Sequence, residues 1–329
     1  MTDQPTLRRW ARRLRRITIA TVVIVLVLVG ALVATTARYE RAARTRFARE
    51  YPPVGELVDI GGRRIHLDCR GSGSPTVVFE SGLDVYGSQS WTKVHDAIAS
   101  TTRACAYDRA GKLWSDPSPQ RPDGGAVAGD LHAALTAAGE SGPLVLVGHG
   151  VGAAYVLTFT ERYGDDVAGL VLVDAFHPDQ FERLPDPNAP LATDKWDIDR
   201  LGARLAWTGL TRMATAQDRP ENAPGDAGVR IQRYLPTSLA ALVAERNTVR
   251  HTLGQAGGSR ALADRPLIAL TASDQTLPQR QEQAMTALHR DLASWSGAGR
   301  QETVRDSGSF IQNDQPDAVI TAVREVIGR

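Results

Sequence analysis

The chain has 329 residues, which is enough for one large domain or two small ones. Its 38 Lys and Arg side chains are balanced by 37 Asp and Glu, so composition excludes a general role in binding nucleic acid or another polyanion. Charge is concentrated only in the basic N-terminus, residues 1–16, which carries Arg8, Arg9, Arg12, Arg13, Arg15 and Arg16.

The segment Ile17 to Ala37 follows this basic N-terminus and has 21 residues without a charge. About 20 apolar residues cross a bilayer as a helix, and the segment has no polar face of the kind a soluble core helix would need. We therefore predict a transmembrane helix over 17–37. Signal-peptide cores are usually about 7–15 residues long, which favours a retained anchor. Cleavage stays open, because Thr35-Thr36-Ala37 is a weak cleavage site.

The arginines before this segment predict a cytoplasmic N-terminus and a folded part outside the cytoplasm. Residues 38–54 are also basic, which reduces the asymmetry, and they form a predicted helical stalk that ends at Pro52-Pro53. Cys69 and Cys105 fall in predicted strands. They either form a disulfide, which an oxidising compartment permits, or are two small buried apolar side chains.

From residue 55 onward, short apolar stretches alternate with helical patterns. The predicted strands are 56–60, 64–69, 76–80, 103–108, 144–148, 169–174, 267–271 and 302–305. The predicted helices are 91–100, 126–138, 153–163, 278–295 and 316–327. This alternation predicts one α/β domain over 55–329, with a mostly parallel eight-stranded sheet covered by helices. The first two strands form a hairpin through Gly61-Gly62 and make the sheet mixed.

The alternation is interrupted once, between the sixth and seventh strands. Residues from about 177 to 263 contain no convincing strand, but they include helical stretches near 198–214 and 238–253. A connection of this length is too large for a plain loop, so we predict an inserted helical lid.

The most informative motif follows the fifth strand. Residues 143–155 read as a buried strand, a sharp turn and the start of a helix, which is the plan of a nucleophile elbow, Gly-x-Ser-x-Gly. Gly148 and Gly152 hold the framing positions, but Gly150 stands at the nucleophile position and has no side chain to attack a carbonyl. Elbow residues adopt backbone angles that cost about 1–3 kcal/mol when a Cβ is present, so Gly150 is expected to relieve strain.

These elements, in this order, resemble the α/β-hydrolase fold family, especially its esterase- and epoxide-hydrolase-like members. The resemblance covers about residues 55–328. Beyond the elbow and the inserted segment, it rests on Phe79-Glu80-Ser81-Gly82-Leu83, Tyr107-Asp108-Arg109-Ala110-Gly111, Trp114-Ser115-Asp116, Leu170-Val171-Leu172-Val173-Asp174 and Ser307-Gly308-Ser309-Phe310.

The resemblance implies a nucleophile, an acid and a histidine in that order along the chain. Asp274, after the seventh strand, is the candidate acid, and Asp174, after the sixth, is the alternative acid. The histidine position falls on Ser309. A serine hydroxyl has no pKa near neutrality, so it cannot replace an imidazole as the base. His177, after the sixth strand, could reach the site as a displaced base, although a structural role is favoured.

The resemblance also places the oxyanion hole on the backbone N–H groups of Leu83 and Val151. We expect Asp84 to face solvent and the His149 ring to point away from the pocket floor. Leu113 stands where relatives usually have the second glycine of a turn. If that turn needs a positive φ, leucine costs about 1–2 kcal/mol there.

We predict a single-pass membrane protein, anchored through residues 17–37, whose extracytoplasmic domain is a non-catalytic pseudo-hydrolase. It retains a pocket for a small apolar or ester-like ligand, or it binds a protein partner. The alternative is an active hydrolase of esters or related apolar substrates that uses Asp274, Asp174 and His177. No cofactor, metal or nucleic acid is expected, because the sequence has neither metal-ligand spacing nor a glycine-rich phosphate loop.

Overall fold

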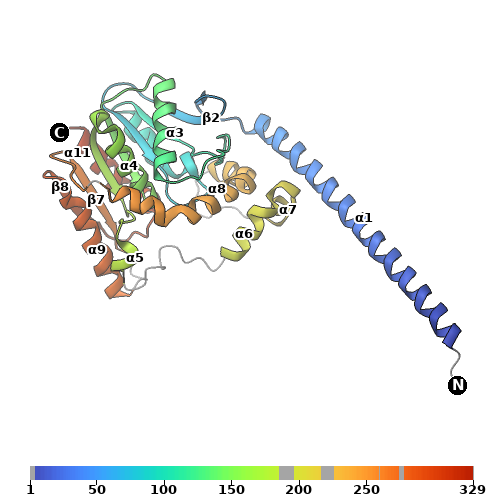
Figure 1. The fold of residues 1–329 in the computed structure, drawn as a ribbon. Coiled ribbons are helices and arrows are strands. Elements are labelled where there is room, and N and C mark those ends of the chain that lie inside the picture. The colour runs from blue at the N-terminus through green and yellow to red at the C-terminus, as the bar shows by residue number, and fades with distance from the viewer. Residues whose placement is uncertain (1–3, 185–195, 216–225, 259, 274–277, 329) are drawn as a thin grey trace.

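A computed structural model of the chain describes residues 4–184, 196–215, 226–258, 260–273 and 278–328. A long N-terminal helix, α1 (Gln4–Glu50), precedes an α/β domain (Figure 1). α1 runs without a break through the predicted span and most of the predicted stalk. Among the described residues, one helix is long and apolar enough to cross a membrane, and it is this one, with a mean hydropathy of 3.0 in its most apolar window.

The domain is built on one eight-stranded sheet, and all eight predicted strands are confirmed with small shifts at their ends. The strands are β1 (Glu56–Asp59), β2 (Arg64–Arg70), β3 (Thr76–Glu80), β4 (Ala104–Tyr107), β5 (Leu144–His149), β6 (Val167–Val173), β7 (Leu267–Ala272) and β8 (Gly299–Val304). Their order is β1-β2-β4-β3-β5-β6-β7-β8. β2 is antiparallel to both of its neighbours, and the other pairs are parallel, as the leading hairpin predicts.

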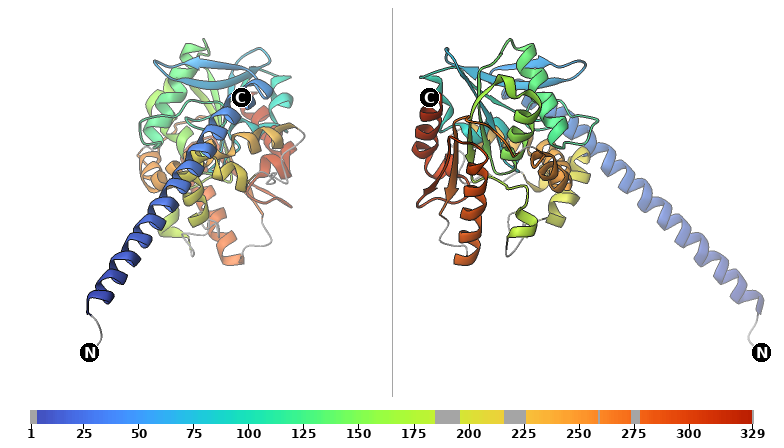
Figure 2. Two further views of the ribbon diagram at one scale, coloured as in Figure 1. Left: turned by 90° about the vertical axis from the view of Figure 1, so that its right-hand side faces the viewer. Right: turned by 60° about the vertical axis from the view of Figure 1, so that its left-hand side comes forward.

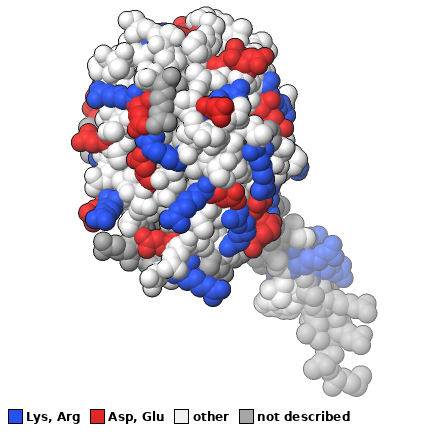
Figure 3. All heavy atoms as spheres, turned by 90° about the vertical axis from the view of Figure 1, so that its left-hand side faces the viewer, with Lys and Arg blue, Asp and Glu red and all other residues white. Residues whose placement is uncertain are grey.

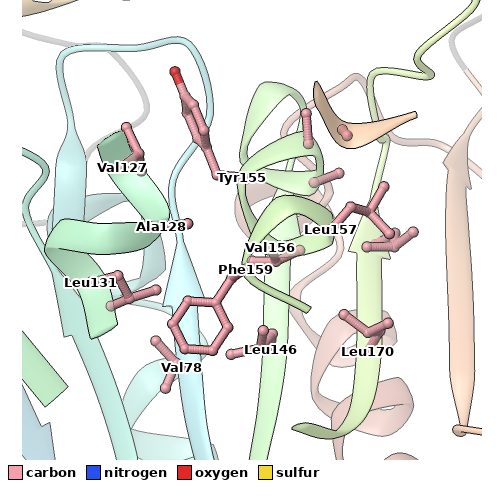
Figure 4. Close-up of a cluster of buried hydrophobic side chains, with 14 of the residues drawn as sticks. Val78, Val127, Ala128, Leu131, Leu146, Tyr155, Val156, Leu157, Phe159 and Leu170 are labelled. Atoms are coloured by element: carbon pink, nitrogen blue, oxygen red, sulfur yellow. The ribbon is translucent and has the colours of Figure 1, made fainter. Parts of the chain in front are cut away.

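Helices cover both faces of the sheet because its buried strands are apolar on both sides. Val77 and Phe79 of β3 point to the face covered by α2 (His95–Ala99) and α11 (Pro316–Ile327). Val78 points to the other face, where it lies beside α3 (Gly124–Ala137) and α4 (Val151–Tyr163) (Figure 4). α9 (Gln279–Ser294) packs on the same face. The predicted helix over 91–100 is shorter than expected, because a 3₁₀ turn, η1 (Gly87–Trp91), precedes α2. Two short elements complete the domain, η2 (Gly164–Asp166) and α10 (Ile311–Asp314).

Residues 177–263, here named the insertion, connect β6 to β7. Their described parts contain α5 (Gln180–Arg183), α6 (Trp196–Leu205), η4 (Ala206–Thr208), α7 (Leu210–Ala214) and α8 (Asp226–Ala256). The single helix predicted near 198–214 is wrong in one respect. It is broken at Gly209, whose φ of +81° lies in the left-handed region that a glycine adopts at little cost. The helix predicted near 238–253 is part of the longer α8, which continues through Pro236.

The two cysteines form a disulfide. Cys69 of β2 lies directly opposite Cys105 of β4 in the antiparallel register, with their Cα atoms 4.0 Å apart. Of the two alternatives that the sequence leaves open, the structure has the bonded one.

Charged side chains of both signs are interspersed on the face of the domain shown in Figure 3. On the face shown in Figure 3, Lys and Arg alternate with Asp and Glu, and neither sign forms a continuous field. This distribution agrees with the balanced composition of the chain and does not favour a polyanionic partner on that face.

Candidate functional site

The predicted nucleophile elbow is present as a strand, a one-residue turn and a helix. β5 ends at His149, Gly150 follows with φ 54° and ψ −119°, and α4 begins at Val151. The Gly150 N–H donates to the Val173 carbonyl at 3.0 Å, and its carbonyl accepts from the Phe176 N–H at 2.9 Å. Both backbone groups of the turn are therefore held by β6 and the segment that follows it.

Two of the three elbow glycines are required for space, and the third is favoured by its backbone angles. A Cβ on Gly148 would lie 2.8 Å from the backbone of Ala153, and one on Gly152 would lie 2.6 Å from the Ser81 carbonyl oxygen. Both distances are too short for a real contact. A Cβ on Gly150 would instead lie 3.9 Å from the Phe176 ring, which is an ordinary van der Waals distance. Gly150 is therefore favoured by its positive φ and not by lack of space.

The predicted oxyanion donors lie on the two segments beside this turn. Val151 is the first residue of α4, and Leu83 lies in the loop between β3 and η1. Among the described residues, no hydrogen bond from either N–H is present. Two backbone N–H groups next to the elbow are therefore free to donate to a carbonyl oxygen.

Ser309, at the predicted histidine position, lies in the loop between β8 and α10. Its backbone carbonyl accepts a hydrogen bond from Nε2 of His149 at 3.0 Å. The His149 ring also lies 4.8 Å from the Phe310 ring, and a Cβ on Gly82 would come within 2.5 Å of its Nδ1. The ring, expected to point away from the site, thus packs between the loop that carries Leu83 and the loop that carries Ser309. Nδ1 is buried and has no hydrogen-bond partner among the residues that the structure describes.

Two carboxylates accompany His149. Asp84, expected to face solvent, is buried: its Oδ1 accepts the N–H groups of Tyr86 at 2.8 Å and Gly87 at 3.3 Å. Asp174, the alternative acid, has a φ of 44° and accepts the Ala272 N–H at 3.3 Å. Burial lowers the pKa of His149, whereas the carboxylates of Asp84 and Asp174 act to raise it. Two sequence positions point to this cluster, Asp84 beside Leu83 and Asp174 after the sixth strand.

The other predicted residues do not join this group. His177 is fully buried against α9, where its Nε2 lies 3.3 Å from Oδ2 of Asp291 and its Nδ1 accepts the Asp179 N–H at 2.9 Å. These three side chains are close enough to surround a cation, but Arg260 already pairs with Asp179, and Arg183 with Asp291. Asp274 lies outside the described residues.

The environment of His177 predicts a pH dependence of stability. Burial lowers its pKa to about 4, against the pull of Asp291 and Asp179. The unfolded chain therefore takes up a proton near pH 6.5, while the folded chain resists it until about pH 4. We expect the free energy of unfolding to fall as the pH drops through this window, and the fall to be shallower in His177→Gln. Equal slopes in urea titrations of both proteins would contradict this assignment.

A buried charge network that the sequence did not reveal joins the insertion to the site. The Arg109 guanidinium donates to both carboxylate oxygens of Glu245 on α8, at 2.7 and 2.8 Å, and also pairs with Glu80 of β3. Nζ of Lys112 lies 3.0 Å from Glu245. Burial alone would raise the pKa of Glu245, but Arg109 and Lys112 hold it below its ordinary value. All four charged side chains are nearly inaccessible.

The same guanidinium shapes the oxyanion loop. Arg109 donates to the backbone carbonyls of Ser81 and Gly82, each at 2.7 Å, directly before Leu83. Glu245 on α8 and the Leu83 loop are therefore held by one buried side chain.

Leu113 has a φ of 38°, so the turn does need a positive φ at the position where relatives have glycine. Its N–H donates to the Ser238 hydroxyl at 3.0 Å, and its side chain is buried. Contact with α8 thus accompanies a strain of about 1–2 kcal/mol.

The model of the α/β hydrolase fold family matches residues 75–288, which is more than half of the chain. The chain therefore belongs to the α/β hydrolase fold family.

Individual relatives are more distant. An uncharacterized protein of Schizosaccharomyces pombe is 34% identical over an alignment covering 34% of this chain and 26% of that protein. A protein of Hormonema carpetanum with the name probable transporter is 33% identical over 39% of this chain and 20% of its own length. The chain thus spans only 26% and 20% of the lengths of these two relatives. Among solved structures, an esterase from Exiguobacterium antarcticum has a TM-score of 0.60 at 15% identity, covering 84% of this chain and all of its own.

Proposed function

We propose that this chain is a membrane-anchored pseudo-hydrolase that binds a small apolar or ester-like ligand and does not hydrolyse it by the serine-hydrolase route. The observation that carries the proposal is the elbow. Its geometry, its framing glycines and the space above it are those of a nucleophile site, yet position 150 has no side chain. A tetrahedral adduct cannot form on a residue without a nucleophilic atom.

The proton-transfer group is absent from its usual position as well. Ser309 offers a hydroxyl where an imidazole would be needed, and His177 is bound to Asp179 and faces Asp291. Without an imidazole at position 309 to take its proton, even an introduced hydroxyl would stay protonated. Two separate losses argue more strongly against turnover than either one alone.

The predicted oxyanion hole is the reason to expect a ligand that carries a carbonyl group. The N–H groups of Leu83 and Val151 do not depend on the missing side chains, and Arg109 braces the loop that carries Leu83. A weakly bound ester or acyl ligand would accept hydrogen bonds from these two N–H groups through its carbonyl oxygen. The hollow of about 610 Å³ lined by Tyr163, Asp166 and Arg265 lies at the C-terminal end of α4 and is a separate feature.

Helix α1 supplies the proposed anchor. Its apolar run is as long as a bilayer is thick, and arginines precede it, which supports a cytoplasmic N-terminus. The Cys69–Cys105 disulfide supports a domain in an oxidising compartment, outside the cytoplasm.

The test uses the full-length chain in detergent micelles. We expect a fluorophosphonate probe to leave it unlabelled, and p-nitrophenyl octanoate to raise its melting temperature without being hydrolysed above the blank. Ester hydrolysis that disappears in Asp274→Ala or Asp174→Ala would refute the proposal and favour the alternative, an active hydrolase with displaced groups.

One observation favours that alternative, and it concerns His149 rather than His177. The buried Nδ1 of His149, which no described residue hydrogen-bonds, lies close to the carboxylate of Asp84, next to the elbow. Hydrolysis that is lost in His149→Gln but kept in His177→Gln would assign the base to this side chain.

A further inference from the structure

The insertion carries an apolar surface that the proposed function does not use. Among the described residues outside α1, every exposed large hydrophobic side chain lies on α6, η4 or α7, namely Ile198, Leu201, Trp207, Leu210 and Met213. We name these five side chains the α6–α7 apolar face. Trp207 is 61% exposed and Ile198 69%. Exposed apolar side chains gathered on one short segment indicate a surface that contacts another apolar phase.

Helix α1 packs against the same segment. These contacts set the position along α1 at which the α6–α7 apolar face lies. Thr36, Glu40, Ala43 and Phe47 form the buried stripe of α1, at helical spacing. The Glu40 carboxylate accepts two hydrogen bonds from Arg212 of α7, at 2.6 and 2.9 Å. Both views in Figure 2 show α1 running past this part of the insertion.

The backbones approach each other closely at Gly209, between Trp207 and Leu210. A Cβ on Gly209 would be 2.6 Å from the Thr36 carbonyl oxygen, so the two backbones are in contact there. Thr36 is the last residue but one of the uncharged run Ile17 to Ala37. At about 1.5 Å per residue, 21 residues measure roughly 30 Å, the thickness of a hydrocarbon core. If α1 spans the bilayer, the level of Thr36 is the boundary between acyl chains and headgroups.

From this coincidence we propose that the α6–α7 apolar face lies in the headgroup–acyl boundary of the bilayer that α1 spans. The inference rests on the proposed membrane anchor. Trp207 is then at the depth where tryptophan is enriched in membrane proteins. Arg38 and Arg41, exposed on the first turn after the apolar run, lie at the level of the lipid phosphates and suit their charge. The occupant of the α6–α7 apolar face is phospholipid. The insertion then contacts both α1 and the lipid of the bilayer.

Spin labels on the full-length chain in phosphatidylcholine–phosphatidylglycerol nanodiscs test this placement. A nitroxide is attached to one added cysteine, with the native disulfide intact, in Met213→Cys or Leu201→Cys. Leu26→Cys within the apolar run and Thr321→Cys on α11, at the end of the domain remote from α1 (Figure 1), are the reference positions. The ratio of oxygen to nickel-chelate accessibility is measured by power saturation. We expect the labels at 213 and 201 to shift from the aqueous ratio of Thr321→Cys toward that of Leu26→Cys.

The reference labels separate two kinds of failure. Lipid-like accessibility at position 26 with aqueous values at both 201 and 213 would overturn the membrane contact and leave the anchor standing. Aqueous values at position 26 as well would overturn the anchor itself. Two label positions on the α6–α7 apolar face guard against one cysteine variant that fails to fold.

Discussion

Replacing Glu245 with glutamine is expected to lower the free energy of unfolding by about 3–5 kcal/mol, the typical cost of breaking a buried ion pair. The substitution leaves two buried cations, Arg109 and Lys112, facing the single carboxylate of Glu80. For a domain of this size, the loss corresponds to a drop in melting temperature of roughly 6–15 °C. Thermal unfolding of the full-length chain in detergent micelles measures it.

The matched control is Glu50→Gln, the same chemical change in an exposed pair. Glu50 lies 3.6 Å from Arg46, and both side chains are about half exposed, at 50% and 57%. Such pairs contribute less than about 1 kcal/mol, so this variant should melt close to the parent chain. A Glu245→Gln variant that melts like Glu50→Gln would show that the network does not stabilise the domain.

A double variant tests the charge imbalance itself. Adding Lys112→Met to Glu245→Gln leaves Arg109 opposite Glu80, with one charge of each sign. Part of the lost stability should return, because the penalty belongs to the unpaired cation and not to the missing carboxylate alone. The Lys112→Met single variant completes the double-mutant cycle, which gives the interaction energy between the two positions.

The sheet could be predicted because its signals are local. Each strand is a short apolar stretch between turn residues, and Leu144 to His149 needs no distant partner to be recognised. The insertion was harder to predict because its helices are defined by tertiary contacts. α8 extends through Pro236, a residue that ordinarily ends a helix, and Gly209 breaks a pattern that otherwise continues.

The candidate site divides in the same way. The positions of Gly150 and Ser309 follow from the order of elements along the chain, and the positive φ at Leu113 follows from a motif. The burial of Asp84, the direction of the His149 ring and the pairing of Arg109 with Glu245 do not. The last of these joins residues 136 positions apart, and only the placement of α8 across the sheet edge brings them together.

Restoring both missing groups is the prediction with the largest expected effect on activity. The double variant Gly150→Ser/Ser309→His should react with a fluorophosphonate and hydrolyse p-nitrophenyl octanoate at least about 10³-fold faster than either single variant. A hydroxyl fits at position 150, where an added Cβ meets only the Phe176 ring and Gly82, at 3.9 and 4.0 Å. The elbow and the oxyanion N–H groups need no change.

The single variants separate chemistry from strain. Gly150→Ser alone supplies a nucleophile without a base, so it should stay unlabelled. It should also lose about 1–3 kcal/mol of stability, because a residue with a Cβ is strained at φ 54°. Gly150→Ala should lose the same amount, since the cost belongs to the backbone and not to the hydroxyl. A serine variant as stable as the parent chain would refute the strain argument.

Gly152→Ala is the steric counterpart within the same turn. Its methyl group would lie 2.6 Å from the Ser81 carbonyl oxygen, so it must displace the strand-end backbone and should destabilise more than Gly150→Ala does. This ordering distinguishes a glycine required for space from one favoured by its backbone angles. If the folded double variant showed no labelling, positions 150 and 309 would not correspond to a nucleophile and its base. Labelling that appears only when both groups are present would mean that the elbow has the geometry for catalysis and lacks only the nucleophile and the base.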